Sequence, residues 1–277
     1  MSHSGPITGT AGYLRRRITG DCKVDESGFD PEFNDLVFMP LFRPLYRTWF
    51  RVRMRGIEHV PASGAALVVA NHSGVLPFDA LMLQAGVFDE HPQHRVLRVL
   101  SADLVYEVPV LSGLARRSGH IRADPERADQ VLSAGHLVGV FPEGFKGIGK
   151  PFKERYQLQR FGRGGFAATA RRAGVPIIPC AIVGAEEIYP MIGNSRAVAR
   201  LLRLPYFPVT PLFPWLGPVG AVPLPSNWII EFCPPVPAGS PNGASAGQAV
   251  SSLADNVRDI IQRKLDEILA ERGPAFS

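Results

Sequence analysis

The chain has 277 residues, 45% of them apolar, and a formal net charge of +5, which excludes an intrinsically disordered protein and allows a large core. The modest basic excess fits nucleic acid, an anionic membrane surface or a phosphate-bearing substrate, and selects none of them alone. Its three cysteines lie far apart without metal-binding spacing, so we expect a reducing compartment and no disulfide framework. We also expect neither a signal peptide nor a transmembrane helix.

Helical spacing dominates the N-terminal part of the chain. Residues 1–30 are rich in glycine, serine and threonine, and we expect them to be loosely ordered. An amphipathic helix is predicted at about 33–50, because large apolar residues fall in pairs four apart: Val37, Phe38, Leu41, Phe42, Leu45, Tyr46, Trp49 and Phe50. Pro40 and Pro44 predict kinks in this helix. Its other faces carry three arginines, Arg43, Arg47 and Arg51. Two interpretations stay open: the helix packs on the core, or it lies in a membrane interface.

The middle of the chain alternates between strand and helix patterns. Continuous or alternating apolar runs predict strands within 51–61, 65–70, 95–101, 136–141 and 175–184. Helical spacing lies between these runs, at 78–86, 107–116, 125–135 and 161–173. This alternation predicts a single α/β domain over 31–277, built on a mostly parallel sheet with functional loops at the carboxyl ends of its strands.

Two further segments complete the chain. Residues 204–225 are apolar but contain seven prolines, which excludes a regular helix and leaves a loop around the core or an apolar lip facing lipid. After a polar linker, an amphipathic helix is predicted at about 248–271, with one apolar face formed by Leu253, Val257, Ile260, Ile261, Leu265 and Ile268.

The stretch "NHSGVLPFDA" (71–80) brings a histidine and an aspartate directly after the predicted strand 65–70. One interpretation is a polar loop followed by a helix cap. The other is a general base with its partner: His72 within reach of a hydroxyl takes its proton, and Asp79 fixes the tautomer of the ring. Other stretches are needed to decide between them.

A second stretch of interest, "VGVFPEGFKG" (138–147), ends a predicted strand with Phe-Pro-Glu-Gly. It overlaps "GFKGIGKP" (144–151), which nearly fits the phosphate-loop pattern of nucleotide triphosphatases. That pattern requires a hydroxyl residue after the lysine, where this chain has Pro151. We therefore do not predict a nucleotide site here.

Four blocks in order resemble the glycerolphosphate and lysophospholipid acyltransferase family: "NHSGVLPFDA", "GHIRADPERA" (119–128), "VGVFPEGFKG" and "VPIIPCAIVG" (175–184). The resemblance covers roughly 50–235. It implies an O-acyltransferase that moves a fatty acyl group from acyl-CoA or acyl carrier protein to a hydroxyl of a lipid, such as a lysophospholipid or glycerol phosphate. It implies no cofactor, no metal and no serine or cysteine nucleophile.

The resemblance also implies roles for individual residues. His72 is the general base and Asp79 orients it. The acceptor site is implied to contain Glu143, Gly144, Lys146 and Arg122, with Lys150 as a second candidate for phosphate. Lysine binds phosphate as a point charge, without the two-pronged geometry of arginine.

The chain departs from the family pattern at three points. Six residues instead of four separate His72 from Asp79, and Phe145 stands where the family has threonine. The arginine that the family has after the isoleucine of the second block has no clean match, and Arg122 and Arg127 flank its expected place. Two alternatives stay open: a neutral acylglycerol or acylated glycoside as acceptor, or a non-catalytic lipid-binding protein on the same fold. An insoluble acceptor implies a peripheral protein on the cytoplasmic face of the cell membrane, with no nucleic-acid partner.

Overall fold

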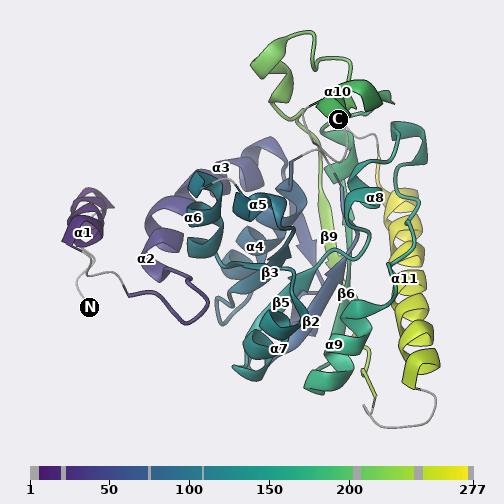
Figure 1. Ribbon diagram of the computed structural model, residues 1–277, viewed down its shortest axis with the longest axis horizontal. Helices are drawn as coiled ribbons and strands as arrows, with labels where there is room; N and C mark the ends of the chain where they lie inside the picture. The colour runs from purple at the N-terminus through teal and green to yellow at the C-terminus, as the bar shows by residue number, and fades with distance from the viewer. Residues whose placement is uncertain are drawn as a thin grey trace.

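A computed structural model describes residues 6–19, 23–73, 76–107, 109–201, 207–239 and 246–273. Within them the core element is a seven-stranded sheet (Figure 1). From one edge to the other its strands are β1 (Arg53–Arg55), β9 (Ile229–Phe232), β6 (Ile177–Val183), β2 (Ala66–Ala70), β5 (Leu137–Val140), β3 (Leu97–Ser101) and β4 (His120–Arg122). Strands β6, β2, β5, β3 and β4 are parallel, whereas β9 runs antiparallel to β6 and parallel to β1. The predicted single α/β domain with a mostly parallel sheet is confirmed.

Helices cover both faces of this sheet. The longer ones are α1 (Pro6–Thr19), α4 (Phe78–Glu90), α6 (Pro109–Arg117), α7 (Pro125–Ser133), α9 (Gly165–Ala173) and α11 (Ala246–Glu271). Short elements follow the strands: η3 (Ile57–His59), α5 (Leu104–Glu107), α8 (Phe145–Ile148), η4 (Phe152–Glu154), η5 (Ala185–Glu187), α10 (Arg196–Leu201), η6 (Gly217–Ala221), and the hairpin of β7 (Gly193–Asn194) and β8 (Pro208–Val209).

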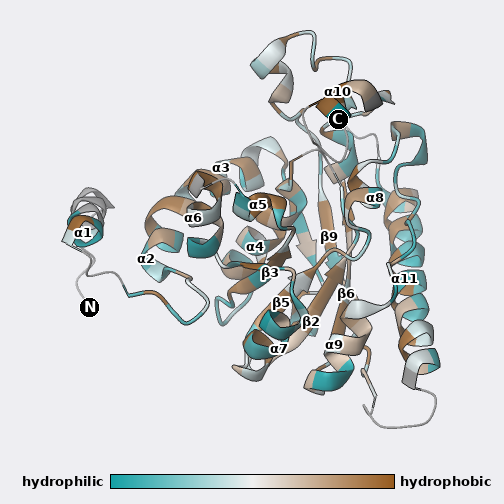
Figure 2. Ribbon diagram, viewed as in Figure 1, coloured by the Kyte–Doolittle hydropathy of each residue, from teal (hydrophilic) through white to brown (hydrophobic). Residues whose placement is uncertain are grey.

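The strands alternate their side chains between two separate apolar clusters. Val68 of β2 points into the cluster that contains α4 and the N-terminal helices, and Leu67 points into the cluster that contains α7, α9 and α11. Because both faces are covered, β2 and β6 are buried along their whole length. Figure 2 shows the brown, apolar strands between helices whose outer faces are teal.

The N-terminal thirty residues differ from the expectation of loose order. Residues Pro6–Thr19 form helix α1. Tyr13 donates to Asp30 over 3.2 Å, and Arg16 pairs with Glu32 at 2.6 Å. These long-range contacts override the low helix propensity of a glycine- and threonine-rich stretch.

The predicted helix at 33–50 is present as a run of four short elements. They are α2 (Pro31–Phe33), the π-helical η1 (Asn34–Phe38), α3 (Met39–Pro44) and the π-helical η2 (Leu45–Trp49). The wider π turns lie on either side of the proline-containing α3, where a regular hydrogen-bond ladder cannot continue.

This N-terminal segment packs on the core, as the first of the two interpretations predicted. Phe38, Tyr46 and Phe50 are buried. Its arginines are engaged as well: Arg43 and Arg47 both pair with Asp89 of α4, at 2.8 and 3.3 Å. The membrane-interface interpretation of the whole stripe is therefore wrong.

Candidate active site

His72 and Asp79 lie at the carboxyl edge of the sheet, where β2 ends and α4 begins. His72 is the second residue after β2, and Asp79 is the second residue of α4. The Nδ1 atom of His72 donates to Oδ2 of Asp79 over 2.6 Å. The two side chains therefore converge despite the longer spacing between them. Two residues of the connecting loop, 74 and 75, lie outside the described residues.

The Asp79 carboxylate is fully buried and held on three sides. Besides the His72 ring, its Oδ2 accepts the backbone N–H of Ser73 over 2.8 Å, and its Oδ1 accepts that of Ala80 over 2.8 Å. Its place in the first turn of α4 adds the favourable end of the helix dipole. The carboxylate is thus fixed in one orientation, with an acceptor aimed at His72.

The His72 ring is the solvent-facing member of the pair. Its side chain is 18% exposed and lies on the ring of Phe141, with centroids 4.8 Å apart. Burial lowers the pKa of His72, but the charge and hydrogen bond of Asp79 outweigh burial, so that the pKa is raised above its usual value. No hydrogen bond to Nε2 occurs among the described residues. This nitrogen is free to take a proton from a bound molecule.

The Glu143 carboxylate contacts the backbone of the site, whereas the resemblance implied a place for it in the acceptor site. Its side chain is fully buried, and its oxygens accept the backbone N–H groups of His72 (3.0 Å) and Gln159 (2.7 Å). A carboxylate occupied in this way does not face an acceptor. Glu143 instead anchors the backbone that carries the His72 ring.

Two glycines allow the chain after Glu143 to approach His72 closely. Gly144 has φ +54° and ψ −143°, a conformation that strains any residue with a Cβ. A Cβ on Gly147 would lie 2.7 Å from Cβ of Glu143 and 3.0 Å from the His72 carbonyl oxygen. Gly144 therefore turns the backbone into α8, which is where the resemblance placed an acceptor-contacting loop.

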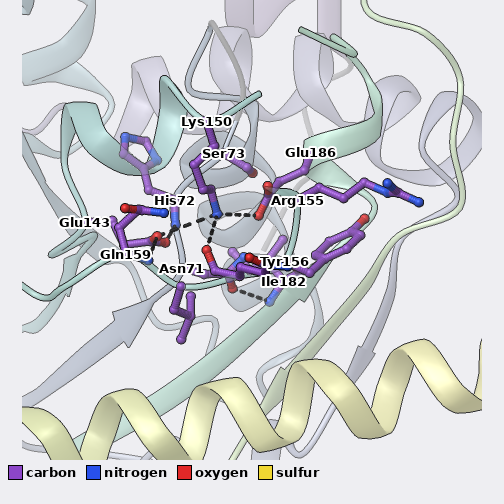
Figure 3. A network of polar contacts seen from close by, with 12 residues as sticks. Asn71, His72, Ser73, Glu143, Lys150, Arg155, Tyr156, Gln159, Ile182 and Glu186 are labelled. Atoms are coloured by element: carbon purple, nitrogen blue, oxygen red, sulfur yellow. Dashed lines mark hydrogen bonds and ion pairs between the residues drawn. The ribbon is translucent and has the colours of Figure 1, made fainter. Parts of the chain in front are cut away.

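The two lysines that follow this turn have opposite environments. Lys146 is exposed on α8 and has no ion-pair partner in the described part of the chain. Lys150 is buried, 3.0 Å from Glu186 and 3.6 Å from Glu143, and also donates to the Gln157 carbonyl (3.2 Å). Figure 3 shows its ammonium group between the two carboxylates. Of these two lysines, Lys146 is the one whose ammonium group is exposed.

Arg122 lies at the far edge of the sheet from the other site residues. It ends β4, three strands from β2, which corresponds to roughly 14 Å across the sheet. It pairs with Asp103 at 3.0 Å and lines a separate cavity of 1170 Å³ beside Tyr106 and His120. The structure therefore places Arg122 three strands away from His72, and its predicted role in acceptor binding stays a prediction.

Two buried residues of this site, Asn71 and Glu186, escaped sequence reasoning, and a third, Lys150, was assigned a different role. Asn71 bridges β2 to β6, because its side chain donates to the Ile182 carbonyl (2.9 Å) and accepts the Ile182 N–H (2.7 Å). Its position directly before His72 was a usable signal. The sequence around Lys150 nearly fits a phosphate loop of nucleotide triphosphatases, which pointed to a different role. No local pattern singles out Glu186. No cluster of metal-binding side chains occurs within the described ranges.

The comparison with known proteins now bears on this geometry. A family model described as "Acyltransferase" matches residues 51–183, which contain His72, Asp79 and Glu143. An uncharacterized protein of Mycobacterium tuberculosis is 52% identical over 272 residues, covering 98% of this chain and 76% of that protein. The chain belongs to the acyltransferase family.

More distant proteins are similar to this acyltransferase as well. The DGAT1/2-independent enzyme synthesizing storage lipids from Bos taurus is 28% identical over 60% of this chain, which spans about half (48%) of that relative. The crystal structure of the 1-acyl-sn-glycerophosphate acyltransferase PlsC from Thermotoga maritima shares the fold, with a TM-score of 0.57, 17% identity, and coverage of 86% of this acyltransferase and 80% of that chain.

Proposed function

We propose that this acyltransferase moves a fatty acyl group from acyl-CoA or acyl carrier protein to a lipid hydroxyl, with His72 as general base. The observation that carries the proposal is the buried Asp79 carboxylate on Nδ1 of a histidine whose Nε2 is free. This arrangement selects the tautomer with its lone pair on Nε2. No further cofactor is needed for the reaction.

The proposed reaction balances within the two substrates and His72. Nε2 takes the proton of the acceptor hydroxyl as its oxygen attacks the thioester carbonyl carbon. Asp79 stabilises the imidazolium that forms. When the tetrahedral intermediate collapses, the C–S bond breaks and the imidazolium returns its proton to the leaving thiolate. The products are an ester and a free thiol, and His72 ends neutral.

A lysophospholipid or glycerol phosphate is the leading acceptor, with a neutral acylglycerol or acylated glycoside as the alternative. The 1-acyl-sn-glycerophosphate acyltransferase fold supports the first. The similarity to an enzyme named for storage lipids and the burial of Lys150 support the second. Mass spectrometry of products formed from labelled acyl-CoA and a panel of both acceptor classes decides between them. Absence of any acylated product with either donor would refute the proposal.

Replacement of Lys146 by Ala tests phosphate recognition. Because this exposed cation has no ion-pair partner in the described part of the chain, we expect KM for a phosphate-bearing acceptor to rise about tenfold. Neutral acceptors should keep their KM. Lys153→Ala, an exposed lysine seven positions later, is the matched control. An equal loss on both acceptor classes would exclude phosphate recognition by Lys146.

We propose that this protein attaches peripherally to the cytoplasmic face of the cell membrane through the segments beyond the carboxyl edge of the sheet. Exposed large apolar residues gather in the connections that follow β2, β3, β5 and β6: Leu76, Leu104, Val110, Leu111, Leu114, Phe145, Ile192, Leu201, Trp215, Leu216, Val219 and Val222. The proline-rich connection projects beyond that edge (Figure 1). No helix in the described ranges is long and apolar enough to cross a membrane.

Three features support lipid as the partner of this surface. The exposed apolar residues surround the edge of the sheet at which His72 lies, so a lipid acceptor would travel only a short distance from the bilayer to His72. Trp215 is 72% exposed, and tryptophan favours the headgroup level of bilayers. Arg200 of α10 is exposed next to Leu201 and would meet anionic headgroups.

The combined substitution of Trp215, Leu216 and Val219 by Ser is expected to weaken binding to anionic vesicles at least tenfold. Loss of three apolar side chains that the bilayer would bury removes several times the ~1.4 kcal/mol that corresponds to a factor of ten. Co-sedimentation at low and high salt measures this. The control is the double variant Ile18→Ser and Val24→Ser, which is equally exposed but remote from the carboxyl edge. Unchanged binding of the triple variant would reject this surface.

A further inference from the structure

Lys150 has an environment that is unusual for a lysine. Its side chain is 3% exposed, and its ammonium contacts Glu143 and Glu186, whose side chains are 0% and 7% exposed. The Gln157 carbonyl completes its hydrogen bonding at 3.2 Å. A buried ammonium is costly unless it is paired and fully hydrogen-bonded, so this arrangement is built around the charge.

The partners of Lys150 come from two connections at the carboxyl edge. Glu143 and Gln157 both lie in the connection between β5 and α9, and Glu186 lies on η5 after β6. One ammonium therefore ties together the loops beside the central strand β2. Figure 3 shows Lys150, Glu143 and Glu186 converging beside His72.

The two carboxylates around Lys150 are not equivalent. Glu143 has strong donors of its own in the backbone N–H groups of His72 and Gln159. Glu186 has fewer hydrogen-bond donors around its carboxylate. Burial raises the pKa of Glu186 to about 7, even though the charge of Lys150 lowers that pKa. Glu186 is therefore the carboxyl of the pair whose pKa lies near neutral pH.

Resting on the proposed role of His72, we propose that Lys150 is a positioning residue: its charge holds Glu143 in the orientation that accepts the His72 N–H, and thereby sets the place and basicity of the His72 ring. Lys150 does not contact the reacting atoms. It acts on His72 indirectly, because Glu143 lies between the Lys150 ammonium and the backbone N–H of His72.

If Lys150 positions the base, its removal changes the pKa of His72, whereas removal of a lysine that only stabilises the fold does not. After burial and Asp79, the charge of Glu143 raises the pKa of His72 and the charge of Lys150 lowers it. Removing the ammonium therefore raises the pKa of His72 further. A larger fraction of the base is then protonated at neutral pH, and the acidic limb of the pH–rate profile moves to higher pH.

The decisive variant is Lys150→Met combined with Glu186→Gln. The double change removes one basic and one acidic side chain. It therefore avoids leaving both Glu143 and Glu186 buried without the Lys150 ammonium, which would destabilise the fold. We expect kcat at pH 7 to fall about 10- to 100-fold, KM for the acceptor to change less than about twofold, and the His72 titration to shift upward.

Histidine NMR on the full chain measures the titration, with the His72 signals assigned by their loss in His72→Ala. Lys153→Met is the matched control, since it removes an exposed lysine three positions away. A folded double variant with wild-type kcat and wild-type His72 titration would overturn the proposal. Glu186→Gln alone keeps the Lys150–Glu143 pair and should leave kcat within about threefold; a loss as large as that of the double variant would also overturn it.

The two kinds of readout separate this inference from the proposed reaction. The His72 titration requires no substrate, so it tests the action of Lys150 on His72 even for acceptors that give no product. Failure of the wild-type protein to acylate any acceptor, with the predicted titration shift present, would refute the reaction and leave the positioning role standing.

Discussion

His72→Ala is expected to abolish detectable acyl transfer while the protein stays folded. The substitution removes the only group proposed to take the hydroxyl proton, and general-base catalysis contributes about 10²- to 10⁴-fold. The fold should survive because the backbone N–H of residue 72 still donates to Glu143, and the lost ring is partly exposed. Initial rates with labelled acyl-CoA, alongside circular dichroism, measure both effects.

The matched control for that variant is His136→Ala. His136 precedes β5 at the opposite, amino edge of the sheet and is only half-buried, so its removal changes one histidine without touching the site. We expect wild-type rates from it. A folded His72→Ala protein that retains more than about a tenth of wild-type kcat would exclude His72 as the base.

Asp79→Asn is expected to lower kcat by about 10⁴-fold with little change in KM. Oδ2 accepts both the His72 ring and the Ser73 N–H, whereas Oδ1 accepts the Ala80 N–H, so an amide whose oxygen stays with Ala80 turns its NH₂ group toward His72 Nδ1. The ring therefore favours the tautomer that protonates Nε2, which cannot accept the hydroxyl proton.

The pH dependence distinguishes this effect from general damage. Asp79 raises the pKa of His72 against the opposing effect of burial, so Asn at position 79 should move the His72 titration to lower pH. If the Asp79→Asn variant loses activity but its His72 titration does not move to lower pH, the loss comes from damage to the fold and not from a change of the His72 tautomer. Thermal unfolding provides the check, because a lost hydrogen bond to a buried group costs about 1–3 kcal/mol.

The sequence carries the elements that local patterns encode. Continuous apolar runs correctly predict β2, β5 and β6, since each is buried on both faces. The contact between His72 and Asp79 could be predicted because His72 follows the apolar run of β2 and Asp79 begins the helical pattern of α4. In contrast, β9 is four residues long and antiparallel, and nothing local tells it from an apolar loop before a proline.

Side-chain direction was the part that local patterns could not supply. Glu143 and Lys146 are three residues apart, yet one faces the interior and the other faces solvent. The turn at Gly144 produces this difference, and its consequence depends on Lys150 and Gln159, which return to the site only after a further loop. The same limit applies to the stripe at 33–50, where Asp89 of α4 takes up the arginines.

The pairing of β1 with β9 sets the order in which this chain can mature on the ribosome. Arg53 lies beside Ile229 in the register, so an early strand gains its neighbour only after nearly the whole sheet has been synthesised. The five parallel strands can assemble first, but the edge at β6 stays open until residues 229–232 emerge. Helix α11 follows later still and seals β6 from one face. Until residues 229–232 emerge, this open edge can pair with another strand, which favours aggregation of the incomplete chain.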